Sequence, residues 1–234
     1  MAISVITPIY NEPCENLERF CSILAAQKGE FEVIFADASE PNFYEGKNFD
    51  LALNLSKIFT PERFQILPCK KGRGAQLDAG TSVAKFEKLL FLHADSAFCD
   101  EGAILAAERA LDCCKAGCFR LKFDESGVLL NLIALGSNLR VKLRNIAFGD
   151  QGIFIQKGLF NAVGGFENLA IMEDYKLSMK LKRSGVKFCQ LGQNIVTSAR
   201  KFRREGVIKT LIKMQILQYK CRSGASADEI AKSY

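Results

Sequence analysis

The sequence predicts an α/β fold, with a mostly parallel, Rossmann-like sheet flanked by helices in a single domain. Short apolar runs alternate with helical patterns four times in the first hundred residues, which is typical of parallel, doubly wound sheets. No linker, internal repeat or low-complexity tract divides the 234 residues. A chain of this length can bury roughly 70% of its unfolded surface, so one domain is sufficient to explain it.

The first half contains four expected strands, over residues 3–7, 31–36, 64–67 and 88–92. Helices are expected over residues 15–27, 50–59 and 72–85, and a loop over residues 8–13. Asp50 is a suitable N-cap for the second helix, and Pro68 follows the third strand. Since ligands bind at the carboxyl ends of strands in such sheets, the residues that follow these strands are the first candidates for a site.

The second half is expected to extend the same sheet. Strands are predicted over residues 118–123, 152–155 and 187–191, and helices over residues 101–115, 128–146 and 174–183. Apolar and polar residues alternate in 118–123, which indicates a strand with one solvated face. Polar residues and a glycine interrupt the apolar segment 128–146, so core packing or a partner helix explains it better than a membrane span.

The composition restricts the class of protein. Hydrophobic residues make up 48% and charged residues 25% of the chain, which excludes disorder for its bulk. The nine cysteines form no CxxC pair and there is one histidine, so we expect free, buried thiols in a reducing compartment and no structural zinc. No apolar stretch approaches the ~20 residues that span a bilayer. We therefore expect a cytoplasmic protein, with peripheral membrane contact as an option.

The net charge of +6 is concentrated near the C-terminal end. The basic residues there include Arg200, Lys201, Arg203, Arg204, Lys209 and Lys213. Such a cluster suits diphosphates or an anionic membrane surface, whereas the lack of interleaved aromatic residues argues against nucleic acid. The helical pattern of residues 207–219 favours packing on its own domain or in a homodimer over lying on a membrane.

Two acidic motifs are the main chemical candidates. An apolar run over residues 89–92 ends on His93, Ala94 and Asp95, and the pair Glu173 and Asp174 opens a helix about 80 residues later. One carboxylate that holds a metal-bound phosphate and one that takes a proton are the minimum for a group-transfer enzyme. Either acid alone is more often a helix cap or a solvated loop residue.

A glycine-flanked arginine precedes the helix expected over residues 72–85. The backbone amides, the helix dipole and the Arg73 guanidinium can all face an anion there, although a solvated arginine is the plain alternative. A dinucleotide fingerprint would need glycine where Leu77 stands, and the Gly-Lys-Ser/Thr of a P-loop is missing. Dinucleotide and ATP sites are therefore not expected.

Six motifs in order resemble the family 2 glycosyltransferases of GT-A fold. They are residues 4–12 (SVITPIYNE), Asp37, residues 72–74 (GRG), residues 93–95 (HAD), residues 149–152 (GDQG) and residues 173–174 (ED). The resemblance covers about residues 2–200. More narrowly, residues 71–77, 92–95 and 171–174 are similar to a small bacterial group called radical-SAM/selenodomain-associated transferase 2.

This resemblance implies one GT-A-like domain with three parts. About residues 1–98 would bind the nucleotide sugar, about residues 99–200 would bind the acceptor and carry the catalytic base, and residues 201–234 would form a basic helical extension. The implied activity is inverting transfer of one sugar from a nucleoside-diphosphate sugar, first of all a UDP-sugar, to a small-molecule or lipid-linked acceptor. The absence of a Gln-x-x-Arg-Trp run argues against a processive polymerase.

The resemblance also implies roles for individual residues. Asp174 would be the general base, and Asp95 would bind a divalent cation, Mn²⁺ or Mg²⁺, that bridges the diphosphate. The residues expected to contact substrate are Pro8, Tyr10, Asn11, Glu12, Asp37, Arg73, His93, Ala94, Asp150, Gln151, Glu173 and Arg200. Glu173 is expected to be an orienting or helix-end residue rather than the base, and Asp150 either lines the acceptor pocket or caps a loop.

His93 stands where the family has the first aspartate of its Asp-x-Asp motif, and a structural role, a ribose contact and metal binding all remain open for it.

Two other activities compete with sugar transfer. A nucleotidyltransferase would carry its glycine-rich loop directly after the first strand, where this chain has residues 8–11 (PIYN). A non-catalytic sugar-nucleotide-binding protein is consistent with His93, but the presence of both Asp95 and Asp174 argues against it.

Overall fold

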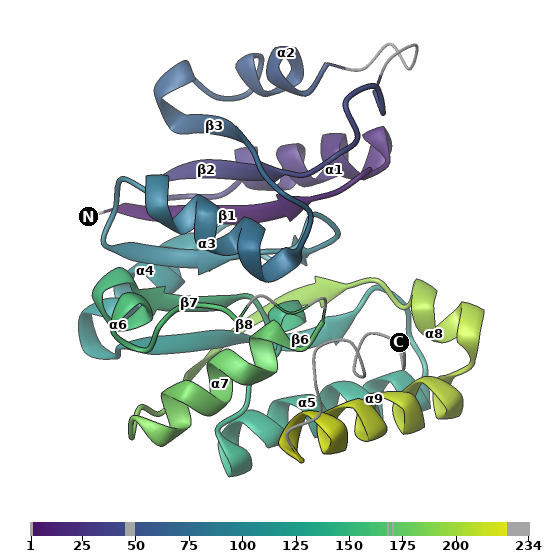
Figure 1. Ribbon diagram of the computed structural model, residues 1–234. Helices are drawn as coiled ribbons and strands as arrows, with labels where there is room; N and C mark the ends of the chain where they lie inside the picture. The colour runs from purple at the N-terminus through teal and green to yellow at the C-terminus, as the bar shows by residue number, and fades with distance from the viewer. Residues whose placement is uncertain (1, 45–49, 168, 170, 224–234) are drawn as a thin grey trace.

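The computed structural model describes residues 2–44, 50–167, 169 and 171–223. The strands are β1 (Ala2–Ile9), β2 (Glu30–Asp37), β3 (Phe64–Pro68), β4 (Lys88–Phe91), β5 (Ala97–Phe98), β6 (Ala116–Phe123), β7 (Ile153–Gln156) and β8 (Cys189–Thr197). Within the described ranges they form one sheet in the order β3-β2-β1-β4-β7-β6-β8-β5, and helices cover both of its faces (Figure 1). The predicted single-domain α/β fold is confirmed.

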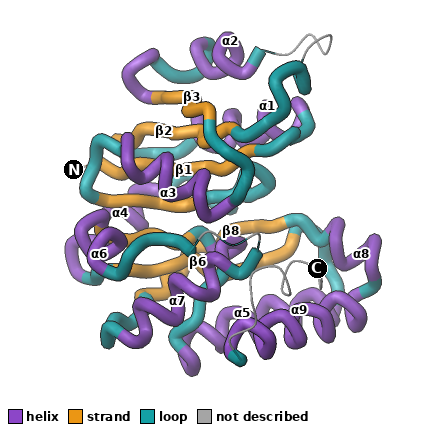
Figure 2. The backbone as a smooth tube through the Cα atoms, viewed as in Figure 1, coloured by secondary structure: helices purple, strands orange, loops and turns teal. Residues whose placement is uncertain are grey.

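Helices connect most of the strands (Figure 2). They are α1 (Cys14–Ala25), α2 (Leu51–Ser56), α3 (Arg73–Val83), α4 (Ala103–Cys113), α5 (Val128–Arg144), α6 (Lys157–Ala162), α7 (Glu173–Arg183), α8 (Arg200–Glu205) and α9 (Val207–Arg222), with short 3-10 turns at Pro61–Arg63 and Gly149–Gln151. Asp50 caps α2 as predicted, since its side chain accepts a hydrogen bond from the Leu53 amide. The helix α6 was not predicted.

The first half of the sheet is parallel. β1 pairs in parallel with β2 on one side and with β4 on the other, and β3 pairs in parallel with β2. The chain therefore leaves β1 toward one edge and later returns to its opposite side, which makes the gap after β1 and β4 a topological switch point. The segments that follow these two strands carry the first and fourth family-like motifs.

The second half departs from the expected parallel arrangement. β7 pairs antiparallel with β4 and with β6, and β5 pairs antiparallel with β8, whereas β6 and β8 are parallel. Neither β5 nor the full length of β8 was expected, since the predicted strand ended at residue 191. β5 is two residues long and β8 is mostly half-buried, so neither has a clear apolar pattern.

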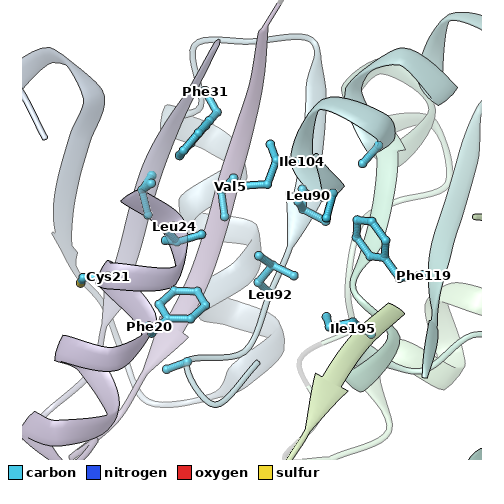
Figure 3. Close-up of a cluster of buried hydrophobic side chains, with 14 of the residues drawn as sticks. Val5, Phe20, Cys21, Leu24, Phe31, Leu90, Leu92, Ile104, Phe119 and Ile195 are labelled. Carbon is cyan, nitrogen blue, oxygen red and sulfur yellow. The ribbon is translucent and has the colours of Figure 1, made fainter. Parts of the chain in front are cut away.

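Two apolar layers enclose the sheet. On one face, Val5 of β1 and Leu90 and Leu92 at β4 pack against α1 and α4, for example against Phe20 and Ile104 (Figure 3). The opposite face packs Ile6, Ile34 and Leu89 against α3, α6 and α7. Successive strand residues point to opposite faces, so both layers require the continuous apolar runs that the sequence shows.

A third, smaller cluster attaches the C-terminal helix beside the first turns of α7. Leu217 and Cys221 of α9 pack against Ile146, Phe148 and Tyr175. The expected helical extension is thus present through Arg222, and its remaining residues 224–234 lie outside the described part. Among the described helices, none has both the length and the apolar character to cross a membrane.

All nine cysteines are free, as predicted, but they are not all buried. Cys21, Cys118 and Cys221 are buried, whereas Cys99 and Cys113 are exposed. Burial raises the pKa of the Cys21 thiol to about 12, so this cysteine behaves as a core residue.

Candidate active site

A cavity of about 260 Å³ lies where β1 and β4 end, and we call it the strand-end cavity. Its lining residues are Pro8, Ile9, Tyr10, Glu12, Arg73, Gln76, His93, Ala94, Asp95 and Arg200. The parallel pairing of β1 with β4 brings the segments after both strands to one edge of the sheet. Eight of the residues singled out from the sequence therefore meet around one space, although four separate segments supply them.

A second cavity, also of about 260 Å³, lies deeper and is called here the inner cavity. Its polar wall includes Arg73, His93, Asp95, Asp150 and Asp174. Its apolar wall includes Leu121, Phe123, Ile133, Phe148, Ile171, Met172, Phe202, Met214 and Leu217. Arg73, His93 and Asp95 line both cavities, so the two spaces lie next to each other around these three residues.

Asp174 is held by backbone groups in the first turn of α7. Its Oδ2 accepts a hydrogen bond from the Gly149 amide at 2.7 Å, and its Oδ1 accepts one from the Tyr175 amide at 2.6 Å. The side chain is 9% exposed and faces the inner cavity. Met172, just before α7, has a φ of 69°, the left-handed conformation of a tight turn into the helix. The carboxylate is thus fixed in direction and still reaches the cavity.

Gly149 permits this arrangement because it has no side chain. A Cβ at this position would lie 2.7 Å from Nε2 of His93 and 3.3 Å from Oδ2 of Asp174. Any larger residue would displace one of these groups. The GDQG motif therefore has a packing function beside the site.

Arg73 and Glu173 form an ion pair that joins the first residue of α3 to the first residue of α7. Nε and Nη2 of Arg73 donate to the two carboxylate oxygens of Glu173. The Glu173 side chain is 1% exposed and does not line either cavity. Burial raises the pKa of Glu173, and the nearby Asp174 adds to this, whereas Arg73 opposes it. This ion pair fixes the position of the Arg73 guanidinium beside the cavities.

Asp150 lines the inner cavity, and one of its carboxylate oxygens, Oδ1, is buried without a hydrogen bond from any of the described residues. Burial raises the pKa of Asp150 to about 6; Arg140 opposes this increase, and Asp174 and Asp95 add to it. An unsatisfied buried oxygen is costly, so this position fits the acceptor-pocket alternative better than the loop-cap alternative.

Arg140 lies behind Asp150 and was not identified from the sequence. Its Nη2 donates to Oε1 of Gln151 at 3.0 Å, and its guanidinium lies 3.9 Å from the centre of the Phe148 ring. Gln151 itself is completely buried and also accepts from the Phe148 amide. It does not line the two cavities, so its position indicates support of Arg140.

Asn11 and Asp37, both expected at the nucleotide, do not line either cavity. The Asn11 amide donates to Oγ of Ser39, and Oδ1 of Asp37 accepts from the Ser39 amide. These bonds hold the loop after β2 against the loop after β1. Asn11 has a φ of 48°, which asparagine tolerates better than most residues.

His93 is surrounded by charged groups. Burial lowers its pKa, and Arg73 lowers it further, whereas Asp95 and Asp174 oppose this effect. The imidazole is thus neutral near pH 7, which is compatible with all three roles considered for it.

Within the described part of the chain, no group of three or more His, Cys, Asp or Glu residues is placed to hold a metal ion. Asp95 nevertheless faces both cavities. A hard cation readily accepts one carboxylate together with diphosphate and water oxygens. The donor set therefore fits Mn²⁺ or Mg²⁺ when substrate supplies the remaining ligands.

Two further residues of the site escaped the sequence analysis. Gln76 is buried, donates to the carbonyls of Ile9 and Ala36, and lines the strand-end cavity. Arg19 of α1 donates to the carbonyl of Asp95 at 3.1 Å. Gln76 could have been recognised as a polar residue on the inner face of α3, whereas no pattern in the sequence indicated Arg19.

Comparison with solved structures identifies the fold. S. aureus TarS 1–349 in complex with UDP-GlcNAc matches with a TM-score of 0.60 and 19% identity over 85% of this chain. The mannosyltransferase PcManGT from Pyrobaculum calidifontis, in complex with GDP-Man and Mn²⁺, matches with a TM-score of 0.64 and 16% identity over 91%. This chain has the fold of these proteins. It spans 58% of the TarS fragment and 63% of the mannosyltransferase.

No protein-family model matches the sequence, and no curated protein does. The identities to the solved structures are low, so the likeness establishes the architecture, and the chemistry must be argued from the residues of the site. That site places the cations Arg73 and Arg200 and the carboxylates Asp95, Asp150 and Asp174 around adjacent cavities. Such a set can bind an anionic group at one end and accept a proton at the other.

Proposed function

We propose that this protein is a glycosyltransferase that transfers one sugar, with inversion, from a nucleoside-diphosphate sugar to an acceptor hydroxyl. The observation that carries this proposal is that Arg73, His93 and Asp95 line both of the adjacent cavities, and that Asp174 lines the inner one. The proteins of similar fold, solved with UDP-GlcNAc and with GDP-Man and Mn²⁺, support a nucleotide-sugar donor. A UDP-sugar is our first candidate.

The donor would occupy the strand-end cavity. Pro8 and Tyr10 form a wall suited to the base and ribose, and Arg73 and Arg200 face the diphosphate. The ion pair with Glu173 limits the movement of Arg73, so less side-chain entropy is lost when the donor binds. Asp95, together with diphosphate oxygens, would hold a divalent cation, which supplies charge stabilisation for the leaving nucleoside diphosphate.

The acceptor would enter the inner cavity and present its hydroxyl to Asp174. Each oxygen of this carboxylate accepts one backbone N–H, so lone pairs remain for the proton of the acceptor. Removal of that proton during a single displacement at the anomeric carbon gives inversion, and general-base assistance is typically worth about 10²–10⁴ in rate. The apolar residues of the cavity wall would exclude water and so limit hydrolysis of the donor.

The three parts of the chain would divide these tasks. Residues up to about 98 would bind the donor, and residues 99–200 would supply Asp150 and Asp174 on the acceptor side. The basic extension contributes Phe202, Met214 and Leu217 to the wall of the inner cavity. This apolar contribution is compatible with a lipid-linked acceptor as well as with a small molecule.

The test is calorimetric titration of UDP, GDP and their sugar conjugates with Mn²⁺ or with EDTA. We expect at least one nucleotide to bind wild-type protein about tenfold more tightly with Mn²⁺, and Asp95→Asn to lose this difference. Asp100→Asn, at an exposed aspartate that lines neither cavity, is the matched control and should behave as wild type. Equal affinities with Mn²⁺ and EDTA would remove Asp95 from the proposed donor site.

A further inference from the structure

The helices α5 and α9 lie side by side at one end of the molecule, away from β1–β3 (Figures 1 and 2). Of the twelve large hydrophobic side chains that are exposed in the described residues, ten belong to these two helices. They are Val128, Leu129, Leu132, Leu135, Leu139, Leu143, Ile208, Ile212, Ile216 and Tyr219. We call this surface the α5–α9 face. Exposed apolar side chains gathered on one surface in this way indicate an interaction site.

The exposure is considerable and follows the helical repeat. On α5, Val128, Leu132 and Leu143 are 80%, 59% and 80% exposed, and on α9, Ile208 and Ile212 are 67% and 56% exposed. Other residues of the same helices, such as Ala134 and Leu217, are buried against the domain. Each helix therefore has one apolar side packed on the protein and another apolar side turned outward.

The charges on the two helices are all positive. Neither α5 nor α9 contains an aspartate or a glutamate, and Lys142, Arg144, Lys209 and Arg222 are exposed on them. Exposed aliphatic groups beside basic residues are the composition of segments that lie in the interface of a membrane. Lipid acyl chains can take up the aliphatic groups, while anionic headgroups pair with the lysines and arginines.

A second copy of the chain is a poorer occupant for this face. In a two-fold symmetric dimer the same surface meets itself, so the basic residues of one copy would approach those of the other. No acidic residue on either helix would compensate this repulsion. The charge pattern therefore favours an anionic partner over self-association.

A groove of about 610 Å³ lies between the two helices and borders the inner cavity. Ile133, Ser137, Met214 and Gln218 line both the groove and the inner cavity. A membrane on the α5–α9 face would thus lie beside a groove that borders the cavity of Asp174. We propose that the α5–α9 face binds the surface of an anionic lipid bilayer. The proposal goes beyond the proposed sugar transfer and does not depend on it.

Vesicle flotation tests the proposal directly. Wild-type protein should float with vesicles that contain about 30% phosphatidylglycerol, should not float with pure phosphatidylcholine, and should be released as the salt concentration rises. The double variant Leu132→Gln, Ile212→Gln removes two exposed aliphatic groups from helices without adding charge. It should lower the partition coefficient at least about tenfold.

The matched control uses the two exposed aliphatic residues that lie elsewhere, Leu53 and Ile58, at 55% and 37% exposure. The double variant Leu53→Gln, Ile58→Gln should float as wild type does. Failure of the wild-type protein to bind anionic vesicles would overturn the proposal, as would equal flotation of both double variants. A dimer in light scattering that is lost in Leu132→Gln, Ile212→Gln, without flotation of the wild type, would assign the face to a second copy and also overturn it.

Discussion

Replacement of Asp150 by asparagine is predicted to stabilise the protein at neutral pH and not in acid. Folding raises the pKa of this carboxyl group from 3.8 to about 6, chiefly through burial. When the pKa of a carboxyl group is higher in the folded than in the unfolded state, its contribution to stability is fully present at a pH below the unfolded-state pKa. That contribution is lost as the pH rises through the folded-state pKa. A pKa shift of this size lowers the free energy of unfolding by about 3 kcal/mol once the group is fully ionised. About 1.4 kcal/mol of this loss occurs between pH 5 and pH 7.5.

Urea unfolding at several pH values between about 5 and 7.5 measures this difference. Relative to wild type, Asp150→Asn should gain about 1.4 kcal/mol of unfolding free energy across that interval, whereas Asp100→Asn should follow the wild-type curve. Arg140 retains Gln151 and Phe148 as partners in the variant, so its burial does not cancel the gain. If the free energies of unfolding of wild type and Asp150→Asn change with pH in parallel, burial does not destabilise the ionised form of Asp150. That result would refute this reasoning.

Two further predictions concern the groups that support the site. Glu173→Gln should raise the donor Kd about tenfold, because glutamine has no charge to hold the Arg73 guanidinium in place. Titration with the donor measures this change. An unchanged Kd would contradict the orienting role. Gly149→Ala places a methyl group 2.7 Å from Nε2 of His93 and should lower both activity and stability, by about 1–3 kcal/mol. Gly158→Ala, where a Cβ meets nothing within 4 Å, is the control, and comparable losses in both variants would contradict the packing argument.

The parallel half of the sheet could be predicted because its strands are buried on both faces. A strand such as β2, with six consecutive buried residues of which only Glu32 is polar, gives a nearly continuous apolar run that is recognised without tertiary information. The residues that follow β1 and β4 could then be placed at one edge. In the structure, Tyr10 and Asp95, which follow these two strands, do line one cavity.

The second half could not be predicted to the same extent. The direction in which β7 pairs with β4 depends on the path of the chain between them, and the four residues of β7 do not encode it. β5 is too short to show a pattern, and β8 is interrupted by polar residues. Antiparallel pairing in this region is therefore a property of the whole fold rather than of the local sequence.

The candidate site was predictable where residues follow strands or open helices, and it was not predictable where they act from the interior of a helix. Asp174 and Asp95 were identified as a pair and do line one cavity. Arg140 was missed because a single arginine in an apolar helix is normally solvated, and only the packing of α5 on β6 places it beside Asp150. For residues 207–219 the sequence left packing on the domain, a homodimer and a membrane as alternatives, because periodicity alone does not tell which apolar side of a helix faces the protein.

Release of nucleoside diphosphate by wild type and by Asp174→Asn tests the central claim most directly. Wild type should release it from at least one sugar nucleotide in the presence of Mn²⁺. The variant keeps the size and most hydrogen bonds of Asp174 but cannot take a proton, so we expect turnover to fall by about 10² or more while the donor Kd changes by less than about threefold. Release by Asp174→Asn at near wild-type rate would show that this carboxylate is not the base and would contradict the proposed mechanism.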